Sequence, residues 1–267
     1  MSQLSLRLKA MFFRAVQSIF TMLDLYLSHP LPQKASFTRS IRSTVSVVPG
    51  TIDLLFYTPP SYNKKLSQTP SQPTKKHPLL INFHGGFTLG HAGDDARVIS
   101  IRLHEEIDRL RQEGGFKGLE KGRLVNLVSV YGGVDWTQTR VERDASNPNL
   151  IPASPHFLLR LSDDGYLSTK PDLRSPLLSP GVASDKLLQD ALPKTLVMIN
   201  CSGDQLLAES EKFRKRLIGL GKDVMGYIVE GEGHGWDKKP TYFKGDEKRD
   251  DAYKYAVEAL QIMWEET

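Results

Sequence analysis

The sequence predicts an α/β fold, in which a mostly parallel sheet carries helices on both faces. Apolar runs at residues 79–83, 124–130 and 195–200 have the length and composition of strands that are buried on both sides. Amphipathic segments with apolar residues at steps of three and four occur at 99–113 and before Gly221. Because the two patterns alternate along the chain, we expect strands joined by crossover helices, and hence a parallel sheet.

The composition indicates one large globular domain. Hydrophobic residues make up 39% and charged residues 25% of the 267 residues. The formal net charge is +4, but basic residues alternate with acidic ones, as over residues 109–121, which argues against a nucleic-acid-binding protein. A single cysteine, Cys201, excludes an intrachain disulfide framework and a thiolate zinc cluster. We therefore expect a reducing, cytoplasmic location, with Cys201 buried in a strand.

Residues 4–28 have the strongest helical periodicity in the chain. The apolar residues that recur at steps of three and four are Leu8, Phe12, Val16, Ile19, Phe20, Leu23 and Leu27. Arg14 and Asp24 make this segment too charged to span a bilayer. We predict an amphipathic helix within residues 1–40 that packs on the rest of the protein. Peripheral contact with a membrane surface is one alternative, and a mitochondrial presequence is another, because residues 1–23 contain no acid.

A hairpin is predicted next, with strands over residues 43–48 and 51–57. Both are rich in β-branched or aromatic residues, and Pro49-Gly50 between them is a turn dipeptide. Residues 58–77 are rich in Pro, Ser, Gln and Lys, which predicts a solvated surface loop. The chain then returns to the sheet.

The strand predicted at residues 79–83 ends abruptly in His84, Gly85, Gly86 and Phe87. Glycines just after a strand let the backbone approach a ligand, because no Cβ stands in the way. Their free N–H groups can hold a developing oxyanion. This loop is therefore a candidate binding loop.

The middle of the chain contains a predicted helix and strand, followed by a region without a regular pattern. A helix over 99–113 and a strand over 124–130 are followed by residues 137–192, which contain six prolines and only short apolar pieces. We predict that residues 137–192 form an inserted, lid-like region.

Two polar residues follow consecutive strands in the last third of the chain. Asp204 comes after the strand at 195–200, and His234 comes after a second strand at 224–229. A final helix is predicted from Asp246 onward. Because the carboxyl ends of parallel strands meet at one edge of a sheet, Asp204 and His234 are expected to lie together there.

Four motifs in this order carry a family resemblance. They are His84-Gly85-Gly86-Phe87, Ser175-Pro176-Leu177-Leu178-Ser179-Pro180, Gly203-Asp204-Gln205-Leu206 and Gly233-His234-Gly235-Trp236. Together they resemble the hormone-sensitive-lipase-like, or GDXG, carboxylesterases, which are α/β-hydrolases of the fold-3 family. The resemblance covers the chain from about residue 45 to its end.

The resemblance implies the hydrolysis of small apolar acyl esters without a cofactor. It makes Asp204 the catalytic acid, His234 the base, and His84, Gly85, Gly86 and Phe87 the oxyanion and ligand-binding loop. It also implies an α/β-hydrolase domain over residues 41–267, with the N-terminal helix in the place of the family's lid helices.

The sequence departs from the family at the nucleophile. No serine has glycine two positions before it and two after it, as a Gly-x-Ser-x-Gly elbow requires; Ser179 and Ser202 come nearest. Residues 88–123 also hold one predicted helix, where the complete fold needs several further elements. We therefore predict that two central strands are missing and that the chain as written is inactive as an esterase.

Two explanations of this gap stay open. The sequence can be incomplete near residues 98–101, through an unusual splice or a gene-model error. Alternatively, the protein is a non-catalytic pseudo-hydrolase that binds an apolar ligand or a protein partner.

Each candidate site residue also has a purely structural interpretation. Asp204 could cap the helix that starts near Leu206, and His234 could be a surface-loop residue. The carboxylates Glu230, Glu232 and Asp237 surround His234, but a single histidine with scattered acids lacks metal-ligand spacing. We predict no metal site.

Overall fold

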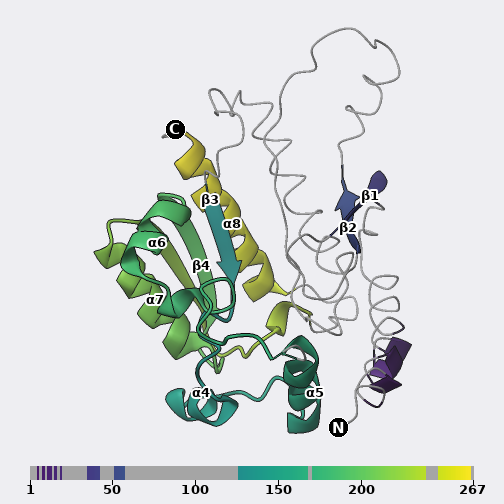
Figure 1. Ribbon diagram of the computed structural model, residues 1–267. Helices are drawn as coiled ribbons and strands as arrows, with labels where there is room; N and C mark the ends of the chain where they lie inside the picture. Colours follow the sequence, from purple (N-terminus) through teal and green to yellow (C-terminus); the bar gives the residue numbers. More distant parts are fainter. Residues whose placement is uncertain are drawn as a thin grey trace, which may run out of the picture. The chain divides into compact units, whose positions relative to one another are not determined.

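The structure is a computed structural model that describes residues 35–42, 51–57, 126–167, 170–238 and 246–265, with a discontinuous set of residues between 5 and 19 (Figure 1). The chain divides into two compact units. The first comprises Met1–Phe116 with Arg160–Thr169, and the second comprises Lys117–Leu159 with Lys170–Thr267.

The first unit contains helical backbone near its start and a two-stranded antiparallel sheet. The described residues between 5 and 19 are helical, as the sequence predicts. Within the part of the chain that the structure describes, no helix is long and apolar enough to cross a membrane.

Strand β1 (Phe37–Arg42) pairs with β2 (Thr51–Phe56), with Phe37 opposite Phe56 and Arg42 opposite Thr51. The Phe37 and Phe56 rings stack with their centroids 4.5 Å apart, which explains how this end of the hairpin is held in register. The predicted second strand is confirmed. The partner predicted at 43–48 is wrong: β2 pairs with residues 37–42, and residues 43–50 lie outside the described part of the chain.

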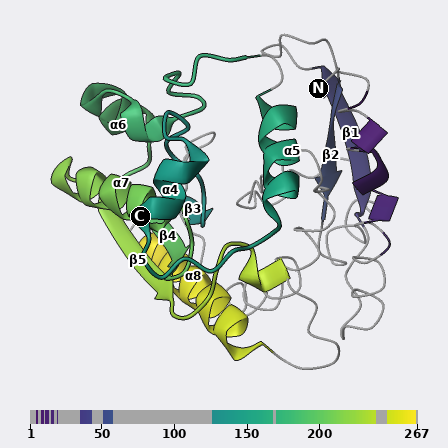
Figure 2. The same cartoon turned by 90° about the horizontal axis from the view of Figure 1, so that it is seen from below.

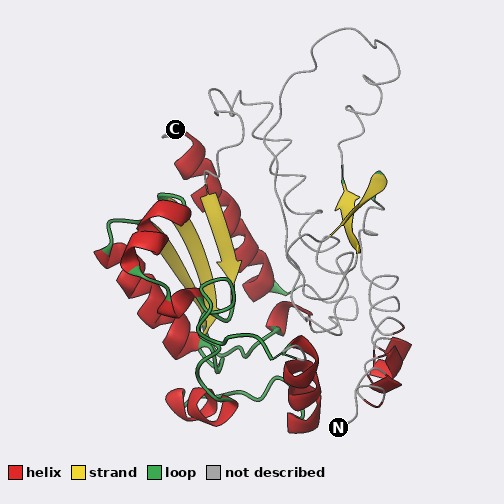
Figure 3. Ribbon diagram, in the orientation of Figure 1, coloured by secondary structure: helices red, strands yellow, loops and turns green. Residues whose placement is uncertain are grey.

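The second unit is built on three parallel strands, β3 (Asn126–Val130), β4 (Thr195–Cys201) and β5 (Asp223–Val229). They are adjacent in that order, so β4 is central (Figure 3). Six of the seven β4 residues are buried, as expected for a strand covered on both faces. All three strands match the apolar runs of the sequence, and Cys201 is buried as predicted.

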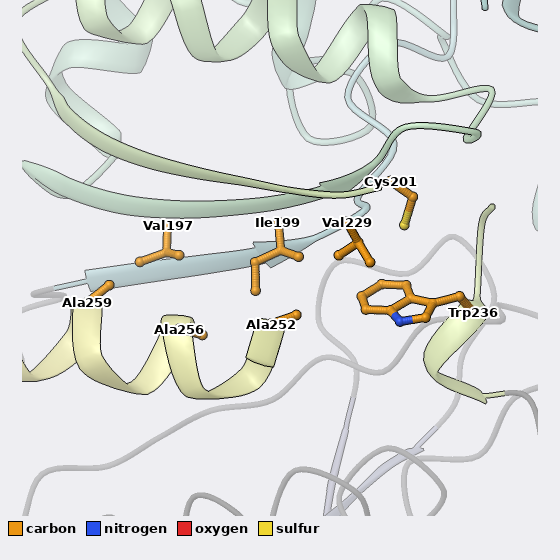
Figure 4. Packing of buried hydrophobic residues seen from close by; sticks show 8 residues of the cluster. All are labelled: Val197, Ile199, Cys201, Val229, Trp236, Ala252, Ala256 and Ala259. Carbon is orange, nitrogen blue, oxygen red and sulfur yellow. The ribbon is translucent and has the colours of Figure 1, made fainter. Parts of the chain in front are cut away.

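Helices cover both faces of this sheet because side chains alternate along β4. Val197, Ile199 and Cys201 face α8 (Glu247–Glu265), where Ala252, Ala256 and Ala259 let the helix lie close to the sheet (Figure 4). Leu196 and Met198 pack on the other face with Phe213 and Leu217 of α7 (Leu207–Gly219). Figure 2 shows α7 and α8 on opposite sides of the strands. The predicted α/β fold class is confirmed.

The region predicted to be irregular contains four short helices. They are α4 (Arg140–Ser146), α5 (His156–Tyr166), the 3₁₀ turn η1 (Pro180–Val182) and α6 (Asp185–Ala191). Helix α4 begins with a capping box between Thr139 and Glu142, and α6 begins at the N-cap Ser184. Leu188 of α6 lies in the core with α7 and β4. A lid-like role for residues 137–192 stays a prediction.

Three predicted elements lie outside the described residues. They are the strand at 79–83, the loop of His84, Gly85, Gly86 and Phe87, and the helix at 99–113.

Candidate active site

Asp204 lies in the turn that follows β4 and is 1% exposed. Its Oδ1 accepts a hydrogen bond from the backbone N–H of Leu206 at 2.9 Å, and its Oδ2 lies 2.9 Å from Nδ1 of His234. The carboxylate is therefore fixed on one side by the backbone and directed at the histidine on the other.

The structure does not support a helix-capping role for Asp204. The N-cap of α7 is Leu206, which has helical backbone angles and no side-chain cap bond. Asp204 precedes it by two residues and closes the turn before the helix.

His234 lies in the glycine-rich loop that follows β5. Gly231 and Gly235 have φ of +71° and +72°, a region that residues with a Cβ adopt rarely, so the loop depends on glycine at both positions. The imidazole is 36% exposed, and its Nδ1 lies within hydrogen-bond distance of the buried carboxylate of Asp204, which can accept the proton of the Nδ1–H tautomer.

A third strand contributes to this edge through Tyr131, which follows β3. Its ring meets the His234 ring edge-on with centroids 4.7 Å apart, and its hydroxyl donates to Oδ1 of Asp237 at 2.5 Å. Tyr253 of α8 donates to the other oxygen of Asp237 at 2.5 Å. Tyr131 also has φ of +37°, a conformation that is rare in residues other than glycine and persists only where the surrounding contacts hold the residue in place.

Sequence patterns did not indicate the roles of Tyr131 and Asp237. Asp237 stood among the acids around His234, and the structure shows it as the acceptor for two tyrosines and a partner of Lys238 at 3.0 Å. Across the described residues no group of three His, Cys, Asp or Glu side chains is arranged to hold a metal ion.

A cavity of about 440 Å³ opens beside His234. Its walls are Asp144, Leu150, Ile151, Pro152, Ala153, Ser154, Pro155, His156, Leu159, Gln205 and His234. Most of this lining comes from the segment between α4 and α5, and it is largely apolar. Such a cavity suits a small ligand with an aliphatic part and a polar group near the histidine.

A buried ion pair fixes α4, and with it the start of the cavity wall. Arg143 Nε lies 3.0 Å from Glu209 Oε2 of α7, with the side chains 6% and 2% exposed. Oε1 of Glu209 accepts the backbone N–H groups of Val134 at 2.8 Å and Asp135 at 3.2 Å. Burial raises the pKa of Glu209, although the Arg143 guanidinium and the two backbone donors oppose this.

Asp135 lies beside this pair, and the pKa of its carboxyl shifts in the opposite direction to that of Glu209. Burial raises the pKa of its carboxyl, but hydrogen bonds from Thr137 and Gln138 outweigh that effect, with help from Arg143. The net result is a lowered pKa, so Asp135 is ionised over the whole physiological range.

The two serines nearest to an elbow pattern are engaged by other groups. Ser179 is fully buried; its hydroxyl donates to the carbonyl of Leu173 at 2.7 Å and accepts the N–H of Trp136 at 2.8 Å. The hydroxyl of Ser202 accepts the N–H of Gly231 at 2.8 Å. Both therefore stabilise loops.

A model of the α/β-hydrolase fold family matches residues 103–238, which is just over half of the chain. The chain belongs to the α/β-hydrolase fold family. The match spans Asp204 and His234 and confirms the resemblance found in the sequence. A search of curated proteins finds no match.

Solved structures of esterases resemble this α/β-hydrolase at low identity. Carboxyl esterase 2 of the fungus Tuber melanosporum is 18% identical, with 63% of this chain and 51% of that chain covered and a TM-score of 0.44. An esterase of Pseudomonas putida is 15% identical (64% and 49% covered, TM-score 0.44), and LipW of Mycobacterium marinum is 17% identical (61% and 46%, 0.43). The chain thus spans about half the length of these proteins.

Within the described residues the parallel sheet has three strands, fewer than a complete α/β-hydrolase sheet. The loss of two central strands stays a prediction, because residues 58–125 lie outside the described part of the chain.

Proposed function

We propose that this α/β-hydrolase is a carboxylesterase-like protein in which Asp204 and His234 are the acid and base of an incomplete triad. The observation that carries this proposal is the 2.9 Å hydrogen bond between His234 Nδ1 and the buried Oδ2 of Asp204, at the carboxyl edge of adjacent parallel strands. A carboxylate in this position holds the imidazole in the tautomer whose Nε2 can accept a proton, and it stabilises the imidazolium that results.

The cavity beside His234 supports a small apolar acyl ester as the ligand. Its aliphatic walls, which include Leu150, Ile151 and Leu159, can bury an acyl chain, and His234 lines the same space. The loop of His84, Gly85, Gly86 and Phe87 is proposed to supply the oxyanion donors. This chemistry requires neither a cofactor nor a metal.

We further propose that the chain as written does not hydrolyse esters by a serine mechanism. The sequence contains no Gly-x-Ser-x-Gly elbow, and the hydroxyls of Ser179 and Ser202 are held by backbone groups. Without a positioned nucleophile, His234 has no hydroxyl proton to accept.

Hydrolysis of p-nitrophenyl butyrate by the purified chain tests this proposal. We expect the wild type, His234→Ala and Asp204→Asn all to hydrolyse the ester no faster than buffer alone. Activity that is lost in both variants would show that a nucleophile is present and that its assigned absence is wrong. Activity that persists in both would exclude Asp204 and His234 from the reaction.

A non-catalytic binding protein is the second candidate, and the cavity favours it. Butyl phenyl ketone, which cannot be hydrolysed, is a suitable probe. We expect it to shift the methyl NMR signals of Ile151 and Leu159, which line the cavity, and to leave the exposed Val141 of α4 unchanged as a control. Equal, small shifts at all three residues would refute a binding cavity.

A further inference from the structure

Asn147, the C-cap of α4, holds the backbone of the turn that carries Asp204. It is 6% exposed, and its Nδ2 donates to the carbonyls of Ser202 at 2.9 Å and Asp204 at 2.8 Å. Its Oδ1 accepts the N–H of Asn149 at 2.9 Å. Both amide donors are thus directed at the acid turn, while the amide oxygen fixes the side chain to its own loop.

Ile151, four residues further along, completes the contact. Its N–H donates to the carbonyl of Gly203 at 2.8 Å, so the segment 147–151 binds three consecutive carbonyls, those of Ser202, Gly203 and Asp204. The N–H of Gly203 in turn donates to the backbone carbonyl of Glu232 at 2.9 Å, and Glu232 lies two residues before His234. A continuous set of hydrogen bonds therefore joins segment 147–151, the turn at residues 202–204 (the acid turn) and the loop that carries His234.

Close packing at the glycines reinforces this contact. A Cβ on Gly203 would lie 2.6 Å from Cδ1 of Ile151, and one on Gly233 would lie 2.9 Å from the carbonyl oxygen of Ile151. The three backbones can approach this closely only because both positions are glycine. The acid turn is therefore located by segment 147–151 as much as by β4.

We propose that Asn147 is a positioning residue that holds Asp204 against His234. The inference rests on the proposed roles of Asp204 and His234 as acid and base, and it adds the residue that sets their geometry. Asn147 touches neither carboxylate nor imidazole; it acts through the backbone carbonyls on either side of Gly203. Loss of two hydrogen bonds from a buried amide frees the turn, and a 2.9 Å side-chain bond is sensitive to small displacements.

The tautomer of His234 measures this effect directly and does not depend on esterase activity. Ring ¹⁵N chemical shifts give the ratio of the Nδ1–H to the Nε2–H form, and the His234 signals are assigned by their loss in His234→Gln. We expect the Nδ1–H form to dominate in the wild type, because that proton is bound by Asp204. In Asn147→Ala we expect the ratio to fall about tenfold, toward its value in Asp204→Asn.

Asn200→Ala is the matched control. Asn200 is also a buried asparagine, 3% exposed, whose Nδ2 donates to Glu211 at 3.0 Å, away from the acid turn. Its loss should destabilise the same unit and leave the His234 ratio unchanged. Asn147→Ser, which retains one donor, should give an intermediate ratio and serves if Asn147→Ala does not fold.

Two results would overturn the proposal. One is a tautomer ratio in Asn147→Ala that equals the ratio in Asn200→Ala. If only Asn147→Ser folds, its ratio is compared with that of Asn200→Ala instead. The other is a wild-type ring that is mainly in the Nε2–H form. Failure of the proposed function is seen separately, in the p-nitrophenyl butyrate assay, and does not alter the tautomer measurement.

Discussion

Replacement of Glu209 by Gln should destabilise the second unit severely while changing hardly any volume. Glu209 and Arg143 are both almost fully buried, and the glutamate also accepts the N–H groups of Val134 and Asp135 through Oε1. Glutamine can keep those two backbone bonds with its own carbonyl oxygen. The substitution therefore removes the carboxylate that pairs directly with Arg143, and the buried guanidinium keeps only its weaker coulombic interaction with Asp135.

The expected loss is large because the remaining charge has no access to water. Removal of one partner from a buried ion pair typically costs about 3–5 kcal/mol, most of it the penalty for an uncompensated charge. Arg143 keeps a bond from Nη2 to the carbonyl of Asp135 and lies 5.0 Å above the Trp136 ring, which limits the loss to the lower part of that range. We predict about 3 kcal/mol, or roughly 150-fold in an opening equilibrium.

Hydrogen exchange of the buried β4 amides measures this change locally. Exchange of the β4 amides should accelerate roughly 150-fold in Glu209→Gln. The control is Asp190→Asn, which breaks an exposed pair with Lys186 whose side chains are 84% and 61% exposed, and which should cost about 0–1 kcal/mol. If both variants accelerate exchange equally, the buried pair has no special role and the reasoning is refuted.

Two further predictions concern packing. Gly203→Ala should cost about 1–3 kcal/mol because its Cβ would meet Ile151, whereas Gly219→Ala, with nothing within 4 Å, should be neutral or gain about 0.5–1 kcal/mol; chemical denaturation compares the two. If two central strands are missing, the whole chain should bind a hydrophobic dye strongly and melt without a sharp transition, and a single cooperative melt without dye binding would contradict that prediction.

The elements that local patterns specify were predicted well. The strands β3, β4 and β5 lie in short, mostly apolar segments, and α7 and α8 have long amphipathic periodicity, so each was identifiable without tertiary information. The short helices α4 and α6 are too brief to show a period. Their only local signals are the caps at Thr139 and Ser184. Strand β1 was missed because arginine and serine alternate with its few apolar residues.

The sequence likewise predicted some residues of the candidate site and missed others. Chain order and flanking glycines were enough to bring Asp204 and His234 together. Asn147 and Tyr131 could not be found, because their partners lie far away in the sequence: Tyr131 bonds to Asp237, 106 residues later. No local pattern encodes such a contact, and only the packed sheet brings the two residues together.

The order of the strands in the second unit has a consequence for how this domain can change over evolution. In the sheet, β3, β4 and β5 are neighbours in the same order in which they occur in the chain. Both ladders of this sheet, and the loops that bear Asp204 and His234, are therefore encoded entirely after residue 125. An in-frame insertion or deletion earlier in the gene leaves these pairings in register, so the contact between Asp204 and His234 can persist while the first half of the chain is remodelled.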